Sequence, residues 1–128
     1  WFITTSFSSK HNNHIFIAPS KTDPITGETE GGAPTVLIEA QATGMPVIAS
    51  DHADIPEIVI NEKSGLIFKE KDTNQLAESI IELIKMKNLW SQMGEYGRKH
   101  VFSQHDIEFI IPQLEKLYDK ARIGRFEK

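Results

Sequence analysis

Three short, continuous apolar runs mark the chain between residues 14 and 68. They are HIFIAPS (residues 14–20), MPVIAS (residues 45–50) and LIF (residues 66–68). Short runs of this kind, bounded by proline or by polar turn residues, are typical of strands that a parallel sheet buries on both faces. The pattern therefore predicts three buried parallel strands.

A helix is predicted between the first two runs. Pro34 suits its first turn, where the missing N–H costs nothing, and Gly44 suits the left-handed position just beyond its end. These two signals place the helix at residues 34–43. After the second run, DHAD (residues 51–54) indicates a loop and PEIVI (residues 56–60) a short turn of helix.

A second helix follows the third apolar run. Asp72, followed three residues later by Gln75, resembles a capping box, in which the two side chains satisfy amides at the helix start. The apolar residues that then fall on one helical face are Leu76, Ile80 and Ile84.

Two more helices are expected toward the C-terminus. One begins near Asn88, and the last covers residues 106–121, with a bend at Pro112 because proline removes a backbone donor there. Four side chains at helical spacing in these segments are predicted to pack in the core: Trp90, Met93, Phe102 and Phe109.

The order of these elements predicts the fold class. Strands and helices alternate with short connections, which favours an α/β fold with a parallel sheet of the doubly wound kind. A chain of 128 residues amounts to one domain at most. It begins with WFITTSFSSK and lacks an initiator methionine and a signal-peptide pattern, so we expect it to be a piece of a longer protein.

Composition narrows the classes of partner. The formal net charge of −4 gives no general attraction to nucleic acid or anionic lipid, so a phosphate in a ligand has to be met locally. The chain has no cysteine, which excludes disulfides and thiolate chemistry. We expect a cytoplasmic protein that binds no nucleic acid, with the inner face of the membrane left open as a location.

A candidate anion site lies where the first helix begins. The preceding segment, residues 21–33, is rich in Gly, Thr, Asp and Pro and is longer than most strand-to-helix loops. A helix N-terminus presents unpaired N–H groups and about half a positive charge, and glycines before it let a ligand approach the backbone. The residues predicted to bind a phosphate or diphosphate are Gly31, Gly32, Thr35 and Val36.

Two carboxylates flank this anion site. Glu39 lies about 6 Å along the helix axis, and helical side chains lean back toward the N-terminus, so its carboxylate reaches beside the phosphate. Glu30 precedes the glycines on the ligand's other side. Carboxylates repel phosphate but accept hydrogen bonds from sugar hydroxyls. The combination predicts a ligand made of sugar, diphosphate and nucleoside.

The motifs taken in order resemble a known family. APS at a strand end, EGGAPTVLIEAQATGMPVIAS, DIPEIV, SGLIF and DTNQLAESIIELI are similar to the C-terminal, donor-binding domain of retaining family-4 type glycosyltransferases. The similarity is close over residues 15–84 and looser beyond. It implies the GT-B architecture of two Rossmann-like domains, of which residues 1–128 would be a single, incomplete one, with the N-terminal acceptor domain absent.

The resemblance also implies roles for the glutamates. In the family's Glu-x7-Glu motif the first glutamate contacts the donor sugar and the second the ribose hydroxyls, which implies a catalytic role for Glu30 and a donor-binding role for Glu39. Eight residues separate them here, one more than in the motif, so the loop path and the role of Glu30 stay open. The implied reaction moves a sugar from a nucleoside diphosphate sugar to an acceptor hydroxyl with retention, in polysaccharide or glycolipid assembly, with no cofactor besides this substrate.

Other features of the sequence bear on alternative interpretations. The DHAD loop brings carboxylates and a histidine together, but such clusters form turns more often than metal sites, and no metal is assigned. A non-catalytic nucleotide-sugar binding or interaction module is the alternative function. A dinucleotide-dependent oxidoreductase is disfavoured because no G-x-G-x-x-G opens a strand-to-helix turn. A three-stranded sheet leaves open edges, so self-association of the isolated chain is also expected.

Overall fold

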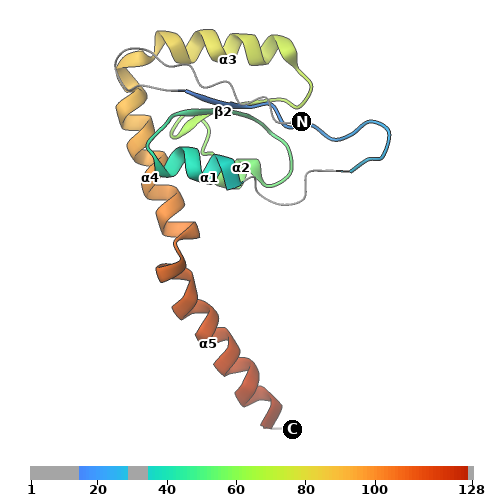
Figure 1. Ribbon diagram of the computed structural model, residues 1–128, viewed down its shortest axis with the longest axis vertical. Coiled ribbons are helices and arrows are strands. Elements are labelled where there is room, and N and C mark those ends of the chain that lie inside the picture. The colour runs from blue at the N-terminus through green and yellow to red at the C-terminus, as the bar shows by residue number, and fades with distance from the viewer. Residues whose placement is uncertain (1–14, 29–34, 127–128) are drawn as a thin grey trace.

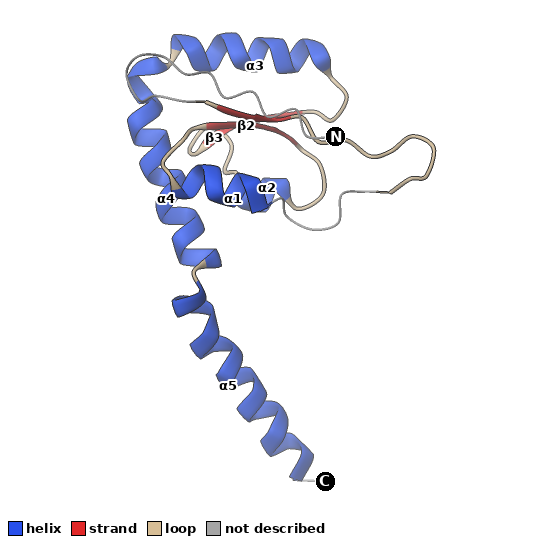
Figure 2. Ribbon diagram, in the orientation of Figure 1, coloured by secondary structure: helices blue, strands red, loops and turns tan. Residues whose placement is uncertain are grey.

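The computed structural model describes residues 15–28 and 35–126 of the chain. Three strands, β1 (Phe16–Ala18), β2 (Val47–Ser50) and β3 (Gly65–Phe68), form a parallel sheet in the order β1-β2-β3. Ile48 of the central strand pairs with Ile17 on one side and Leu66 on the other. The predicted parallel sheet with flanking helices is therefore confirmed (Figure 2).

Helices cover both faces of this sheet and one of its ends. Figure 1 shows α1 and α2 on one face, α3 on the other, and α4 along the end of the sheet that lies away from the loops following the strands. The last helix, α5, extends away from the sheet. The bounds are Thr35–Ala42 for α1, Ile55–Ile58 for α2, Thr73–Lys85 for α3, Trp90–His105 for α4 and Ile107–Phe126 for α5, with a short 3-10 helix at Lys87–Leu89.

The core has two halves, one on each face of the sheet. All four residues of β2 are buried, and they alternate between the faces: Val47 and Ala49 belong to the half that contains Leu37 of α1, and Ile48 to the half that contains Leu83 of α3. Full burial of a side chain such as isoleucine is worth about 1.5–3 kcal/mol. A strand packed on both sides requires an uninterrupted apolar sequence, and this explains why the strands were evident from the sequence.

The C-terminal end of α1 is fixed by two glycines. Gly44 has a left-handed backbone, with φ of 83°, and its N–H donates to the carbonyl of Gln41 at 2.9 Å, as predicted for a helix end. A Cβ atom on Gly94 of α4 would lie 1.9 Å from the Gly44 carbonyl oxygen. Only glycine permits this close approach, so Gly94 sets how α4 packs against α1.

Packing in the helices departs from the predicted pattern in two places. Leu83 of α3 is fully buried, whereas Ile84, predicted to share the core face, is 56% exposed. Met93 of α4 is buried as predicted, but Phe102 is 46% exposed and lies against the Arg98 guanidinium at 5.6 Å instead of in the core. In both helices the buried stripe differs from the one that the apolar spacing predicts. The Phe109 side chain lies outside the described residues.

The start of α3 is capped by one half of the predicted box. The Asp72 carboxylate accepts from the Gln75 N–H at 2.9 Å, as expected. The Gln75 side chain, however, accepts from the N–H of Lys69 and so ties the helix to the chain just after β3. Asp72 therefore caps the helix as predicted, whereas the Gln75 side chain contacts a residue outside the helix.

The last two helices are separated at Asp106, whose backbone is extended with ψ of 124°. α5 then runs through Pro112, so the break in the helical path precedes the proline. Several apolar side chains of α5 are exposed: Ile107, Ile110, Ile111, Leu114, Leu117 and Tyr118. Among the described helices, none combines the length and the apolar character that crossing a membrane requires.

Candidate functional site

The carboxyl edge of the sheet is the natural place for a site in this fold. The three parallel strands end there at Ala18, Ser50 and Phe68, and α1 begins there because it runs back along the face of the sheet. Open α/β sheets bind ligands just outside the carboxyl ends of their strands. Since α4 lies at the opposite end, it leaves this edge uncovered (Figure 1).

The predicted anion site begins at this edge with the first turn of α1. Thr35 is the first residue of the helix, and Thr35 and Glu39, about one turn apart, are both exposed. Val36 is half-buried. The first-turn N–H groups of a helix have no partner within the helix, so they are available to a ligand. The structure thus brings three predicted site residues together on one helix, whereas Glu30, Gly31 and Gly32 lie outside the described residues.

A buried glutamine holds α1 in place. Gln41 has no exposed surface, and its side-chain amide donates to the carbonyl of Ile58 at 3.0 Å, which ties α1 to α2. Gly97 of α4 leaves room for it, because a Cβ atom there would lie 2.9 Å from the Gln41 Oε1 atom. The helix that carries Glu39 is therefore fixed from its buried side.

The loop after β1, residues 19–28 and called the β1 loop below, extends away from the sheet as a preformed turn (Figure 1). The Asp23 carboxylate accepts from the N–H groups of Ile25 at 2.7 Å and Thr26 at 3.2 Å. These two hydrogen bonds, with Ile25 contributing most, lower the pKa of Asp23. The Gly27 N–H donates back to the Asp23 carbonyl with a left-handed φ of 67°. The turn is stabilised within itself.

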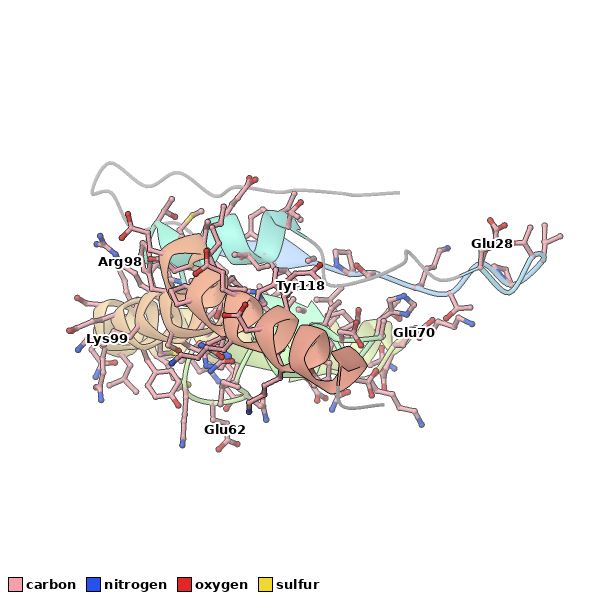
Figure 3. All side chains as sticks on the ribbon, turned by 90° about the horizontal axis from the view of Figure 1, so that it is seen from below. Glu28, Glu62, Glu70, Arg98, Lys99 and Tyr118 are labelled. Carbon is pink, nitrogen blue, oxygen red and sulfur yellow. The ribbon has the colours of Figure 1, made fainter. Side chains whose placement is uncertain are left out.

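A network of polar contacts joins the loops that follow all three strands. The Glu70 carboxylate, just after β3, accepts from the N–H of Thr22 in the β1 loop and lies 3.1 Å from Nδ1 of His52, which follows β2. The Glu70 N–H in turn donates to the Asp51 carboxylate at 2.7 Å. Figure 3 shows Glu70 and Glu28 toward the same end of the molecule, with Glu28 farther out, and Lys99 at the opposite end.

These hydrogen bonds keep Glu70 ionised. They lower its pKa to about 2, first through the Thr22 N–H and then through the His52 side chain. Glu70 is only partly shielded, with 23% of its side chain exposed, whereas His52 is 3% exposed. The carboxylate at the point where the three loops meet therefore stays ionised at a pH well below the ordinary pKa of a glutamate.

His52 has a role beyond the one predicted for the DHAD loop. The loop forms a turn, as expected, closed by the Ile55 N–H on the His52 carbonyl at 3.1 Å, and its histidine is in addition a buried member of the network. Its Nε2 atom is buried and has no hydrogen-bond partner among the residues that the structure describes. Among all the residues that the structure describes, acidic, histidine and cysteine side chains do not come together in groups of three or more that could hold a metal ion.

A shallow cavity of about 250 Å³ adjoins the network on the α3 side. Its walls include Pro19 and Ser20 of the β1 loop and Phe68 at the end of β3. Lys21 and Lys71 also line it and bring two cations to the carboxyl edge. Pockets that enclose a whole ligand usually measure about 300–1,000 Å³. The cavity is therefore smaller than one that encloses a whole ligand, and the described residues form only part of a wall.

Four polar residues at this edge are not predicted as site residues from the sequence: His52, Glu70, Lys21 and Lys71. Each lies within three residues of the end of a predicted strand. Because the carboxyl ends of parallel strands meet at one edge, polar residues at those positions are expected to converge. Their position just after the strands is the signal in the sequence that could have identified them.

Comparisons with known proteins agree with this fold. A model of the family described as glycosyl transferases group 1 matches residues 8–100. The putative colanic acid biosynthesis glycosyltransferase WcaL of Escherichia coli strain K12 is 41% identical over 107 residues, which are 84% of this chain and 21% of that protein. The capsular polysaccharide biosynthesis glycosyltransferase CapM of Staphylococcus aureus is 29% identical over 117 residues, or 91% of this chain and 29% of that protein.

A solved structure extends the comparison to three dimensions. The sucrose-phosphate synthase of Thermosynechococcus elongatus superposes with a TM-score of 0.72 at 30% identity, over 86% of this chain and 26% of that one. The predicted Rossmann-like fold of a GT-B protein is confirmed. The chain spans less than a third of the length of each of these proteins.

Proposed function

The chain belongs to the glycosyl transferases group 1 family, and from this premise we propose that it binds the donor of a retaining glycosyltransferase. The donor is a nucleoside diphosphate sugar, and the acceptor is a hydroxyl of a glycan or glycolipid. Relatives in polysaccharide biosynthesis, and a GDP-mannose-dependent mannosyltransferase of Mycobacterium tuberculosis that is 32% identical over 100 residues, support this class of reaction. We place the reaction in the cytoplasm.

The observation that carries the proposal is the exposed start of α1 at the carboxyl edge. Thr35 and Val36 bring first-turn amides to this edge, and Glu39 lies on the same exposed face about one turn later. The amides suit a diphosphate, and the carboxylate suits the ribose hydroxyls. Gly31 and Gly32 complete the diphosphate contact, and Glu30 contacts the sugar, in the proposal.

The chemistry asked of this site is stabilisation of a leaving group. In glycosyl transfer the bond between the sugar and the diphosphate breaks, and negative charge builds on the diphosphate. A helix N-terminus aimed at that charge favours the transition state over the bound donor. Lys21 and Lys71 line the cavity on the α3 side of the same edge, where Lys71 lies 4.0 Å from the Glu70 carboxylate, so they are not part of this anion site. No cofactor is part of the proposal.

The proposal assigns the acceptor to other parts of a larger enzyme. The chain spans 21% to 29% of the length of the relatives compared above. A wall of one cavity does not enclose both a donor and an attacking hydroxyl. We therefore assign acceptor binding to an N-terminal domain, which also supplies the far side of the donor site.

Calorimetric titration with UDP, GDP, UDP-glucose and GDP-mannose tests the proposal. We expect at least one of them to bind, and Glu39→Gln to weaken that binding about 5- to 150-fold, since a lost charged hydrogen bond costs about 1–3 kcal/mol. Glu78→Gln is the matched control, because Glu78 is exposed on α3, on the other face of the sheet. Equal affinity in wild type and a folded Glu39→Gln variant would remove Glu39 from the site.

A further inference from the structure

The β1 loop has its contacts with the rest of the molecule at its base. The carbonyl of Ser20 accepts from the Ser50 hydroxyl at 2.7 Å, and the N–H of Thr22 donates to Glu70. Beyond Thr22 the loop is exposed, and the hydrogen bonds described for residues 23–28 stay within the turn. The direction in which the loop leaves the sheet is therefore set at Ser20 and Thr22.

Glu70 is itself well placed to hold the loop. Both of its carboxylate oxygens are used: Oε1 accepts from the Thr22 N–H, and Oε2 lies 3.1 Å from the His52 ring and 3.5 Å from the Thr22 hydroxyl. Its own N–H is held by Asp51 at 2.7 Å. The imidazole of His52 is almost completely buried and so cannot swing away without opening the core.

We propose that Glu70, held by His52 and Asp51, is a positioning residue that fixes where the β1 loop leaves the carboxyl edge of the sheet, the edge at which α1 also begins. The effect expected on donor binding rests on the proposed function. Six residues, 29–34, separate the loop from α1 in the sequence, so the loop base and the first turn of α1 are linked through a short stretch of chain. A loop that is already held loses less conformational entropy when a donor binds.

Loss of the carboxylate has a defined effect in this scheme. In Glu70→Ala the Thr22 N–H loses its acceptor, and the base of the loop keeps only its attachment at Ser20. In Glu70→Gln the amide oxygen still accepts from Thr22, but without the charge that strengthens the bond. Thr22→Val is the matched control, because it removes the weak hydroxyl contact at 3.5 Å and keeps the N–H donor. We expect the β1 loop to be held most firmly in wild type and Thr22→Val, less firmly in Glu70→Gln and least firmly in Glu70→Ala.

Two measurements on the same chain test the inference. Amide hydrogen exchange at Thr22, followed by NMR without ligand, should be about 10- to 100-fold faster in Glu70→Ala, the range expected for a lost hydrogen bond to a charged group. Calorimetry with GDP-mannose and UDP-glucose should show weaker binding in Glu70→Ala by about tenfold, with Glu70→Gln in between. The melting temperature of each variant separates this effect from general loss of structure.

The possible results of the two measurements distinguish failure of the inference from failure of the proposed function. Unchanged exchange at Thr22 in both Glu70 variants would overturn the inference, and so would faster exchange with donor affinity unchanged. If wild type binds none of the nucleotides, the proposed function fails, and the exchange experiment still decides whether Glu70 holds the loop. If Glu70→Ala does not fold, amide exchange and donor binding are measured on Glu70→Gln and His52→Gln instead.

Discussion

Replacing Glu70 by glutamine should remove part of the pH dependence of stability between about pH 4.5 and pH 2. In the folded chain its pKa falls from 4.5 to about 2 because the carboxylate accepts from Thr22 and contacts His52. A depressed pKa contributes stability that is fully present above the unfolded value and is lost as the pH falls through the folded value. The window therefore opens near pH 4.5 and closes near pH 2.

The size of the effect follows from the shift. A shift of about 2.5 pKa units corresponds to roughly 3 kcal/mol at most, since one unit is worth about 1.4 kcal/mol. The carboxylate is 23% exposed, so solvent screening reduces this, and we expect about 1–2 kcal/mol. This is large for a single surface-accessible group, because the contact is to a backbone N–H as well as to an ionisable side chain.

The assay is urea denaturation of wild type and Glu70→Gln at pH 7, 4.5, 3 and 2.5. The stability difference between the two should be about 1–2 kcal/mol at pH 7 and should shrink toward zero at the lowest pH. Glu78→Gln, on the exposed side of α3, should follow wild type throughout. A difference that stays constant over the whole pH range would refute the assignment of the low pKa to Glu70.

Three further changes test other parts of the structure. Gly94→Ala should destabilise the chain by about 1–3 kcal/mol or more in thermal unfolding, because its Cβ would meet the Gly44 carbonyl at 1.9 Å, and a melting temperature equal to wild type would contradict this contact. In a complete enzyme, Glu30→Ala should lower turnover far more than affinity for the free nucleoside diphosphate, and equal losses would rule out contact with the sugar alone. The chain alone should self-associate in sedimentation and should show no measurable glycosyl transfer. Transfer is not expected because helix dipoles contribute about 1–2 kcal/mol, whereas even a modest enzyme lowers the barrier by roughly 8 kcal/mol. Turnover by a monomer would contradict both expectations.

The parts of the fold that the sequence predicted are those set by local pattern. The strand at Val47–Ser50 is buried on both faces, so every position had to be compatible with the core. The end of α1 at Gly44 follows from a backbone conformation that glycine adopts most easily. Such features depend on a few neighbouring residues, and the printed sequence contains all of them.

The features that the sequence did not predict depend on how elements meet. Ile84 and Phe102 are apolar at helical spacing, yet they are exposed because each helix packs against its neighbours through a different stripe: α3 against the sheet and α4 chiefly against α1. His52 and Glu70 are 18 residues apart, and nothing in either local sequence indicates that they meet. Their contact comes from the parallel pairing of β2 and β3, which brings the two strand ends to one edge. The strand ends indicate the shared edge from the sequence, but identifying this particular pair required the register of the sheet.

The central claim is that the start of α1 holds the diphosphate of a nucleotide sugar, and amide NMR tests it most directly. The chain, labelled with ¹⁵N, is titrated with the nucleoside diphosphate that binds most tightly in calorimetry. We expect large, saturable shifts for the N–H groups of Thr35 and Val36, with small shifts for Lys99 at the far end of the molecule and for Glu62 in the turn before β3. Saturable shifts that leave Thr35 and Val36 unmoved would contradict the claim.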